Sequence, residues 1–153
     1  MPRLEVEATV AGRDPAAIVD ALADFESYVG HSDTIRSIEV KESEGAEIVS
    51  EWEVEFRGGV IAWSERDVVD RDAGEIRFSQ IEGDSDVWEG SWRVEARDGA
   101  CDVTYSVEYD MGIPSLADQL NPLAAGALYE VVTAVVGGMF GDDAEIRTPR
   151  PGG

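Results

Sequence analysis

The feature that most constrains the fold is a run of six alternating polar and apolar segments between residues 35 and 110. Side chains that alternate in this way predict β-strands with one buried face. The segments cover about 35–43, 46–56, 60–70, 75–82, 86–97 and 100–110. Turn-forming pairs such as Asp98 and Gly99 separate them, and connections this short join only antiparallel neighbours. The run therefore predicts an antiparallel meander.

The segments on either side complete the pattern. Residues 4–10 alternate like a further strand, and Asp14 and Pro15 suit the start of a short helix that runs to about Phe25. Apolar residues repeat at helical spacing from Leu116 to Met139, a segment that includes the long apolar run 121–140. We predict an α+β fold in which a curved antiparallel sheet of about seven strands grips a long C-terminal helix, with short helices between the first and second strands. Residues 1–153 form a single domain, with about 142–153 as a flexible tail.

The charge of the chain limits its partners. It has 33 acidic and 12 basic residues and a formal net charge of −21, and Lys41 is its one lysine. The acids are spread along the strands, as at Glu51, Glu53 and Glu55, which indicates a solvated acidic surface. Nucleic acid and anionic membranes are disfavoured as partners. The pattern resembles that of halophilic proteins, in which molar salt screens such repulsion.

The scarcity of cysteine and histidine excludes several kinds of site. Cys101 and His31 occur once each, so the chain has no intrachain disulfide and no zinc cluster, and we expect neither a metal nor a cofactor. Cys101 suits a small apolar role, and His31 suits a surface or satisfied position. No apolar leader precedes the first strand, which favours a cytoplasmic protein. Glu130 lies in the middle of the run 121–140, which favours a buried amphipathic helix over stable membrane insertion.

The inward positions of the strands are rich in aromatic residues, which predicts a cavity between the sheet and the long helix. The inward residues are Trp52, Phe78, Gln80, Trp88, Gly90, Trp92, Tyr105 and Tyr109. Each aromatic side chain alone suits the core, but together they favour a planar apolar guest. Inward Gln80 needs a partner or a ligand, and Gly90 indicates a close approach to the backbone. Tyr28 is expected near the cavity mouth.

The stretch AWSERDVVD, residues 62–70, mixes polar and apolar residues on both faces of one strand. Ala62, Ser64, Arg66 and Val68 share one side, and Trp63, Glu65, Asp67 and Val69 share the other. If the side of Ser64 and Arg66 faces inward, the arginine must meet an acid or a ligand oxygen. The sequence leaves the ion pair and the ligand contact equally open.

The whole layout resembles the helix-grip (START-like, SRPBCC) superfamily, which includes START-related lipid carriers, polyketide cyclase/dehydrase proteins and coenzyme Q-binding proteins. The run SERDVVDRDAGEIRFSQIEGDSDVWEGSWRVE, residues 64–95, is similar to the aromatase/cyclase pattern. The resemblance implies that Ser64 and Arg66 point at substrate oxygens and that Tyr28 lies at the mouth. Gly90 and Trp92 also match a Gly-x-Trp motif of the family.

These features lead to three functional hypotheses. The first is binding or transport of a hydrophobic, aromatic or quinone-like small molecule in the cavity. The second is an aromatase/cyclase-like enzyme, in which Ser64 and Arg66 polarise a carbonyl; no second acid–base residue is evident in the cavity. The third is an adaptor for a protein partner, which a pull-down with a stoichiometric partner would favour. Fold alone does not separate them.

Overall fold

A computed structural model of the chain describes residues 2–110 and 117–151. Its strands form one antiparallel sheet in the order β2-β3-β4-β5-β6-β7-β1-β8. The strands are β1 (Arg3–Ala11), β2 (Ile35–Glu44), β3 (Glu47–Phe56), β4 (Gly59–Asp70), β5 (Glu75–Gly83), β6 (Val87–Arg97), β7 (Ala100–Asp110) and β8 (Ala144–Ile146). The six strands of the predicted meander are therefore β2 to β7, each next to its neighbour in the sequence.

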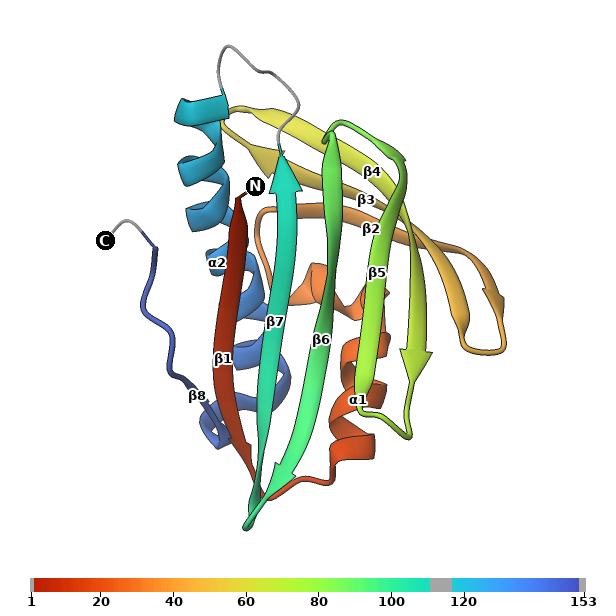
Figure 1. The fold of residues 1–153 in the computed structure, drawn as a ribbon, viewed down its shortest axis with the longest axis vertical. Coiled ribbons are helices and arrows are strands. Elements are labelled where there is room, and N and C mark those ends of the chain that lie inside the picture. Colours follow the sequence, from red (N-terminus) through yellow and green to blue (C-terminus); the bar gives the residue numbers. More distant parts are fainter. Residues whose placement is uncertain (1, 111–116, 152–153) are drawn as a thin grey trace.

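The sheet curves around the long helix α2 (Ala117–Phe140), as Figure 1 shows. The helix α1 (Pro15–Ala23) and the 3-10 helix η1 (Phe25–Gly30) follow β1 and cover the same concave side near one end of the sheet. Side chains from both helical layers and from the sheet form one buried core. The predicted α+β fold, a curved antiparallel sheet gripping a C-terminal helix, is confirmed.

The sheet has one strand more than expected, because part of the predicted tail pairs with β1. A short 3-10 helix, η2 (Gly141–Asp143), leads into β8, which lies antiparallel to β1. Thr148 accepts a hydrogen bond from the Glu7 amide on its Oγ1 at 2.8 Å and another from the Tyr129 hydroxyl on its carbonyl oxygen at 2.6 Å. The prediction of a flexible tail is thus wrong for the residues that make these contacts; residues 152 and 153 of that tail lie outside the described residues.

Strand β4 turns the face of Trp63 and Val69 toward the core, and not the face of Ser64 and Arg66. Trp63 stands opposite Trp52 of β3, and Val69 is buried, so these residues and the two acids between them point toward the core. Arg66 points outward with 52% of its side chain exposed, and its Nε lies 3.6 Å from Glu47 Oε1. Of the two alternatives left open for Arg66, the structure shows the ion pair at the surface, and Ser64 shares that outward face. The packing of Trp63 against the core and the burial of Val69 set the face of the strand, because strand side chains alternate.

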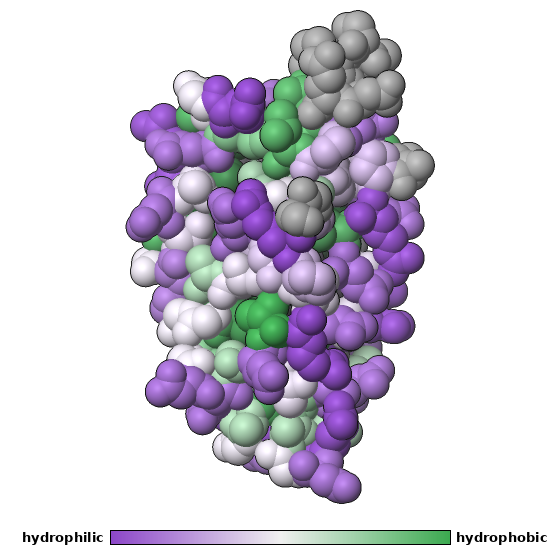
Figure 2. Space-filling view, turned by 90° about the vertical axis from the view of Figure 1, so that its left-hand side faces the viewer, coloured by the Kyte–Doolittle hydropathy of each residue, from purple (hydrophilic) through white to green (hydrophobic). Residues whose placement is uncertain are grey.

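Helix α2 packs on the sheet through an apolar stripe. Val132, Val135, Val136 and Phe140 are buried in the core. The segment Leu120–Asp143 is also long and apolar enough to cross a membrane, but a core helix meets the same test, so this is weak evidence for a span. Figure 2, which looks at the side where β8 and the C-terminus lie, shows hydrophilic residues over most of the surface and hydrophobic ones in small groups.

Candidate functional site

A narrow cavity lies between the concave face of the sheet and α2, with a volume of about 50 Å³. Its lining residues are Phe25, Tyr28, Trp52, Val54, Trp63, Glu65, Phe78, Trp88, Trp92, Tyr105, Leu128, Val131, Val132 and Val135. Aromatic rings supply most of the wall on the sheet side, and α2 supplies aliphatic side chains opposite them. The site is therefore an apolar space with one ionisable carboxyl group, that of Glu65, in its wall.

A second cavity of about 40 Å³ lies beside the first. Val54, Trp63, Trp88 and Leu128 line both cavities, so these four side chains separate them. Pockets for drug-sized ligands are typically about 300–1,000 Å³. In this conformation the aromatic side chains fill most of the interior, and a ligand larger than a small head group requires the separating side chains to move.

Most of the predicted aromatic site residues do lie around these cavities. Those that line the first cavity are Tyr28, Trp52, Phe78, Trp88, Trp92 and Tyr105, and Tyr109 lines the second. Tyr28 is buried rather than exposed at a mouth, and its hydroxyl donates a hydrogen bond to the Leu22 carbonyl at 2.5 Å. Contact of any of these residues with a ligand stays a prediction.

Gln80 and Gly90 have local structural roles. The Gln80 side-chain amide donates to the Ser85 carbonyl at 2.7 Å, while its Oε1 is buried without a hydrogen-bond partner in the described part of the chain. At Gly90 an added Cβ would overlap the Ser106 carbonyl oxygen and would lie 2.8 Å from both Cα of Val107 and Cζ of Phe78. The close approach expected at Gly90 therefore comes from the backbone of the neighbouring strand β7 and from the protein's own phenylalanine ring. Neither residue lines the two cavities.

An acidic pair at the centre of the site was not predicted from the sequence. Glu65 is 3% exposed and Asp67 is fully buried, both on the inward face of β4. Glu65 Oε1 accepts hydrogen bonds from the indole nitrogens of Trp63 at 2.7 Å and Trp88 at 3.2 Å. The signal that could have found the pair is position, since both acids share the face of Trp63 on the strand.

A second set of hydrogen bonds connects Asp67 to β3. Its Oδ2 accepts a hydrogen bond from the Ser50 hydroxyl at 2.7 Å, and Ser50 Oγ accepts one from the Trp52 indole at 2.8 Å. Asp67 Oδ1 is buried without a hydrogen-bond partner among the described residues. Glu65 and Asp67 lie close enough for each to affect the pKa of the other. Glu65 holds the indole N–H groups of Trp63 and Trp88, and Ser50 links Asp67 to the indole of Trp52.

Burial raises the pKa of both carboxyl groups. Desolvation raises the pKa of Glu65 well above its ordinary value, and its interaction with Asp67 raises it further. Burial also raises the pKa of Asp67, but its interactions with Glu65 and Ser50 act in the opposite direction. The burial of this acidic pair therefore favours protonation, most strongly at Glu65.

Two tyrosines lie close enough to this pair for its negative charge to affect their pKa. Burial, followed by the charge of Glu65, raises the pKa of Tyr105 and of Tyr28 well above the ordinary value. The Tyr105 hydroxyl makes no hydrogen bond within the part of the chain that the structure describes, although the residue is only 6% exposed. The cavity therefore contains one buried hydroxyl group that is free to bind a ligand.

No lysine, arginine or histidine lines either cavity among the described residues. The described residues also contain no group of three histidine, cysteine or acidic side chains that could hold a metal ion. The cavity is thus acidic, whereas an inward Arg66 would have made it basic.

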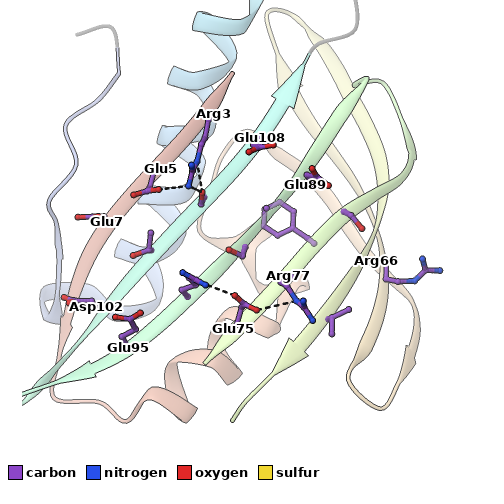
Figure 3. Close-up of a pocket in the computed structure, with 18 of the residues that line it drawn as sticks. Arg3, Glu5, Glu7, Arg66, Glu75, Arg77, Glu89, Glu95, Asp102 and Glu108 are labelled. Carbon is purple, nitrogen blue, oxygen red and sulfur yellow. Dashed lines mark hydrogen bonds and ion pairs between the residues drawn. The ribbon is translucent and has the colours of Figure 1, made fainter. Parts of the chain in front are cut away.

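Several arginines lie instead on the outer face of the sheet, around a shallow hollow of about 870 Å³ (Figure 3). There Glu75 pairs with Arg77 at 3.4 Å and with Arg93 at 3.2 Å, and Arg3 pairs with Glu5 at 3.0 Å. Exposed pairs of this kind contribute little to stability, about 0–1 kcal/mol each. Figure 3 shows Arg66 at the margin of this hollow, pointing away from the sheet.

Comparisons with known proteins agree with this architecture. The model of the family described as "Polyketide cyclase / dehydrase and lipid transport" matches residues 12–136. No curated protein sequence matches the chain.

Several solved structures are similar over nearly the whole chain. The protein TTHA0849 from Thermus thermophilus is 25% identical with a TM-score of 0.81, covering 90% of this chain and 94% of its own. The Zhui aromatase/cyclase from a Streptomyces species is 18% identical with a TM-score of 0.73, covering 92% and 93%. A START superfamily protein from Mycobacterium smegmatis is 14% identical with a TM-score of 0.75, covering 92% and 97%. Because the family model matches most of the sequence, the chain belongs to the polyketide cyclase/dehydrase and lipid transport family of START-like proteins.

Proposed function

We propose that the protein binds a hydrophobic small molecule with an aromatic or quinone-like ring between the sheet and α2. The observation that carries this proposal is the enclosed aromatic cavity, in a chain whose family includes lipid transport. Aromatic and aliphatic walls with few polar groups are typical of small-molecule sites. The ligand enters by displacing the side chains that separate the two cavities, above all Trp63, Trp88 and Leu128.

The alternative, an aromatase/cyclase-like enzyme, loses the two residues on which it was based. Ser64 and Arg66 lie on the outward face of β4, so they cannot polarise a substrate carbonyl in the cavity. Turnover of a poly-β-ketone substrate by the purified protein would restore this alternative.

A cavity-filling variant tests the binding proposal. Leu128→Phe adds volume where the two cavities meet, whereas Leu123→Phe changes a residue of the same helix that is 42% exposed. We expect naphthalene and 1,4-naphthoquinone to quench tryptophan fluorescence saturably in the unchanged protein. Leu128→Phe should weaken both affinities at least about tenfold, a loss of about 1.4 kcal/mol, and Leu123→Phe should leave them unchanged.

The natural ligand is sought separately. Native mass spectrometry of protein purified from its own host, followed by organic extraction, identifies what occupies the cavity. The proposal is wrong if the folded protein shows no saturable quenching with either compound, or if both leucine variants lower the affinity equally.

A further inference from the structure

The sign of the charge in the cavity indicates which kind of hydrophobic ligand it selects. We propose that the cavity binds a hydrophobic amine, whose ammonium group lies between the Glu65–Asp67 carboxyl pair and the surrounding tryptophan rings. This inference rests on the proposed function and specifies its ligand class.

The first support is a buried acidic pair, one oxygen of which, Asp67 Oδ1, has no hydrogen-bond partner among the described residues. The pair is hydrogen-bonded to Ser50, Trp63 and Trp88, but all of these donors are neutral. No cationic side chain lines the cavity in the described part of the chain, and Arg66 of the same strand points to solvent. A buried charge without a counterion is costly, and a cationic ligand in contact with it recovers Coulomb energy in a poorly screened environment.

The second support is the arrangement of the aromatic rings. Trp52 and Trp63 are stacked with centroids 5.6 Å apart, and Trp63 and Trp88 lie 4.9 Å apart. Their indole N–H groups are all bonded to Ser50 or Glu65, which fixes the orientation of each ring beside the carboxyl pair. Faces of tryptophan and tyrosine attract cations within about 6 Å. Carboxyl groups surrounded by such rings favour an ammonium group over a neutral head group.

The third support is the free hydroxyl of Tyr105. Tyr105 lines the cavity close enough to Glu65 for the carboxyl group to raise its pKa, and its hydroxyl lacks a hydrogen-bond partner among the described residues. A tyrosine hydroxyl can accept a hydrogen bond from an ammonium N–H. The acidic pair and this hydroxyl together supply acceptors on more than one side of the head group.

The size of the cavity agrees with a small head group. A volume of about 50 Å³ exceeds the space of one water molecule, about 30 Å³, and is sufficient for an ammonium group with an attached carbon. The apolar body of the ligand then requires the space that opens when Trp63 and Trp88 move toward the second cavity. An anionic head group, such as a carboxylate or an enolate, would instead be repelled by the same pair.

Three ligands with one ring system and different head groups test the inference. We compare 2-naphthylmethylamine, 2-naphthylmethanol and 2-naphthoate by calorimetry at pH 7 in 1 M potassium chloride, which screens the acidic outer surface. We expect the amine to bind at least about tenfold more tightly than the alcohol, and the carboxylate to bind most weakly.

Substitutions of the two carboxyl groups then test whether these groups cause the preference for the amine. Glu65→Gln keeps the shape of the side chain and should lower the affinity for the amine about tenfold or more, while the affinity for the alcohol changes less than about threefold. Asp67→Asn should have the same selective effect and serves if the first variant does not fold. Glu47→Gln removes an exposed acid of β3 and should change neither affinity.

The outcomes separate this inference from the proposed function. Equal binding of amine and alcohol by the unchanged protein overturns the amine inference and leaves hydrophobic binding intact. An amine preference that persists in both carboxyl variants also overturns it, because the preference then comes from the outer surface. Absence of saturable binding for all three ligands contradicts the proposed function itself.

Discussion

Glu65 shows why single residues of this interior were hard to place from the sequence. Both faces of β4 contain polar groups, so hydrophobicity alone does not say which face is buried. The neighbouring Trp63 decides it, because its indole gains far more from removing apolar surface from water than the methyl group of Ala62 on the other face, while Val68 and Val69 are equivalent. The hydrogen bonds that make a buried Glu65 tolerable come from Trp63 of its own strand and from Trp88 of β6, and only the folded sheet brings Trp88 to it.

The raised pKa of Glu65 predicts a distinctive pH dependence of stability. The unfolded chain releases this proton near pH 4, whereas the folded protein retains it to higher pH, so this group lowers the free energy of unfolding as the pH rises between the two pKa values. The slope for one proton is at most about 1.4 kcal/mol per pH unit. Glu65→Gln removes the effect. We expect the stability of the variant relative to the unchanged protein to increase from pH 4 to pH 8 in urea titrations.

The titratable groups that face Glu65 determine which charges can affect this pH trend. They are Asp67 on β4, Tyr105 on β7 and Tyr28 on η1, and α2 contributes only aliphatic side chains to the cavity wall. Glu47→Gln is the matched control, because this acid is exposed on the outer face. The same pH trend in both variants would show that surface charge, and not the buried pair, causes it.

At the scale of elements, the sequence was informative where turns are short and strands alternate. The strands β2 to β7 and helix α2 lie close to their predicted bounds. Strand β8 was missed because it has three residues and follows the helix without an alternating pattern of its own. Its pairing depends on contacts of Thr148 with β1 and α2, which are distant in sequence. Long-range pairing of this kind leaves almost no local signal.

Two adjacent glycines of α2 make a prediction about helix packing. A Cβ at Gly137 would meet no atom within 4 Å, whereas one at Gly138 would overlap the ring of His31. Alanine is about 0.8–1 kcal/mol more favourable than glycine inside a helix. We therefore expect Gly137→Ala to stabilise the protein by up to about 1 kcal/mol and Gly138→Ala to destabilise it, as measured by denaturant unfolding. Destabilisation by Gly137→Ala would contradict the open space at that position, and stabilisation by Gly138→Ala would contradict the described position of His31.

At the scale of the whole molecule, charge dominates. Among the described acidic residues only Glu65 and Asp67 are buried, so the remaining acids contribute to a solvated negative surface. The Debye length falls from about 10 Å at 0.1 M salt to about 3 Å at 1 M. We expect the Tm to rise by at least about 5 °C between 0.1 M and 2 M potassium chloride, or roughly 2 kcal/mol for a domain of this size. Differential scanning calorimetry measures the change.

A variant with fewer charges provides the control for the salt effect. Glu53 and Glu55 are exposed on β3, and the double change Glu53→Gln with Glu55→Gln removes two charges without touching the core. This variant should melt higher than the unchanged protein at 0.1 M salt, with a smaller difference at 2 M. A Tm that does not depend on salt in either protein would refute the halophile interpretation.

The position of β1 has a consequence for how the chain is made. This first strand lies between β7 and β8, and Arg3 pairs with Glu108. A ribosome that adds about 5–20 residues per second needs roughly 5–20 s to synthesise the hundred residues between them. During that time the hydrogen-bonding edges of β1 have no partner strand, and its apolar face is incompletely covered. The high contact order of the finished sheet also makes the pairing of β1 with β7 slow. The newly made chain therefore passes through an interval in which β1 is open to association with other chains or to capture by a chaperone.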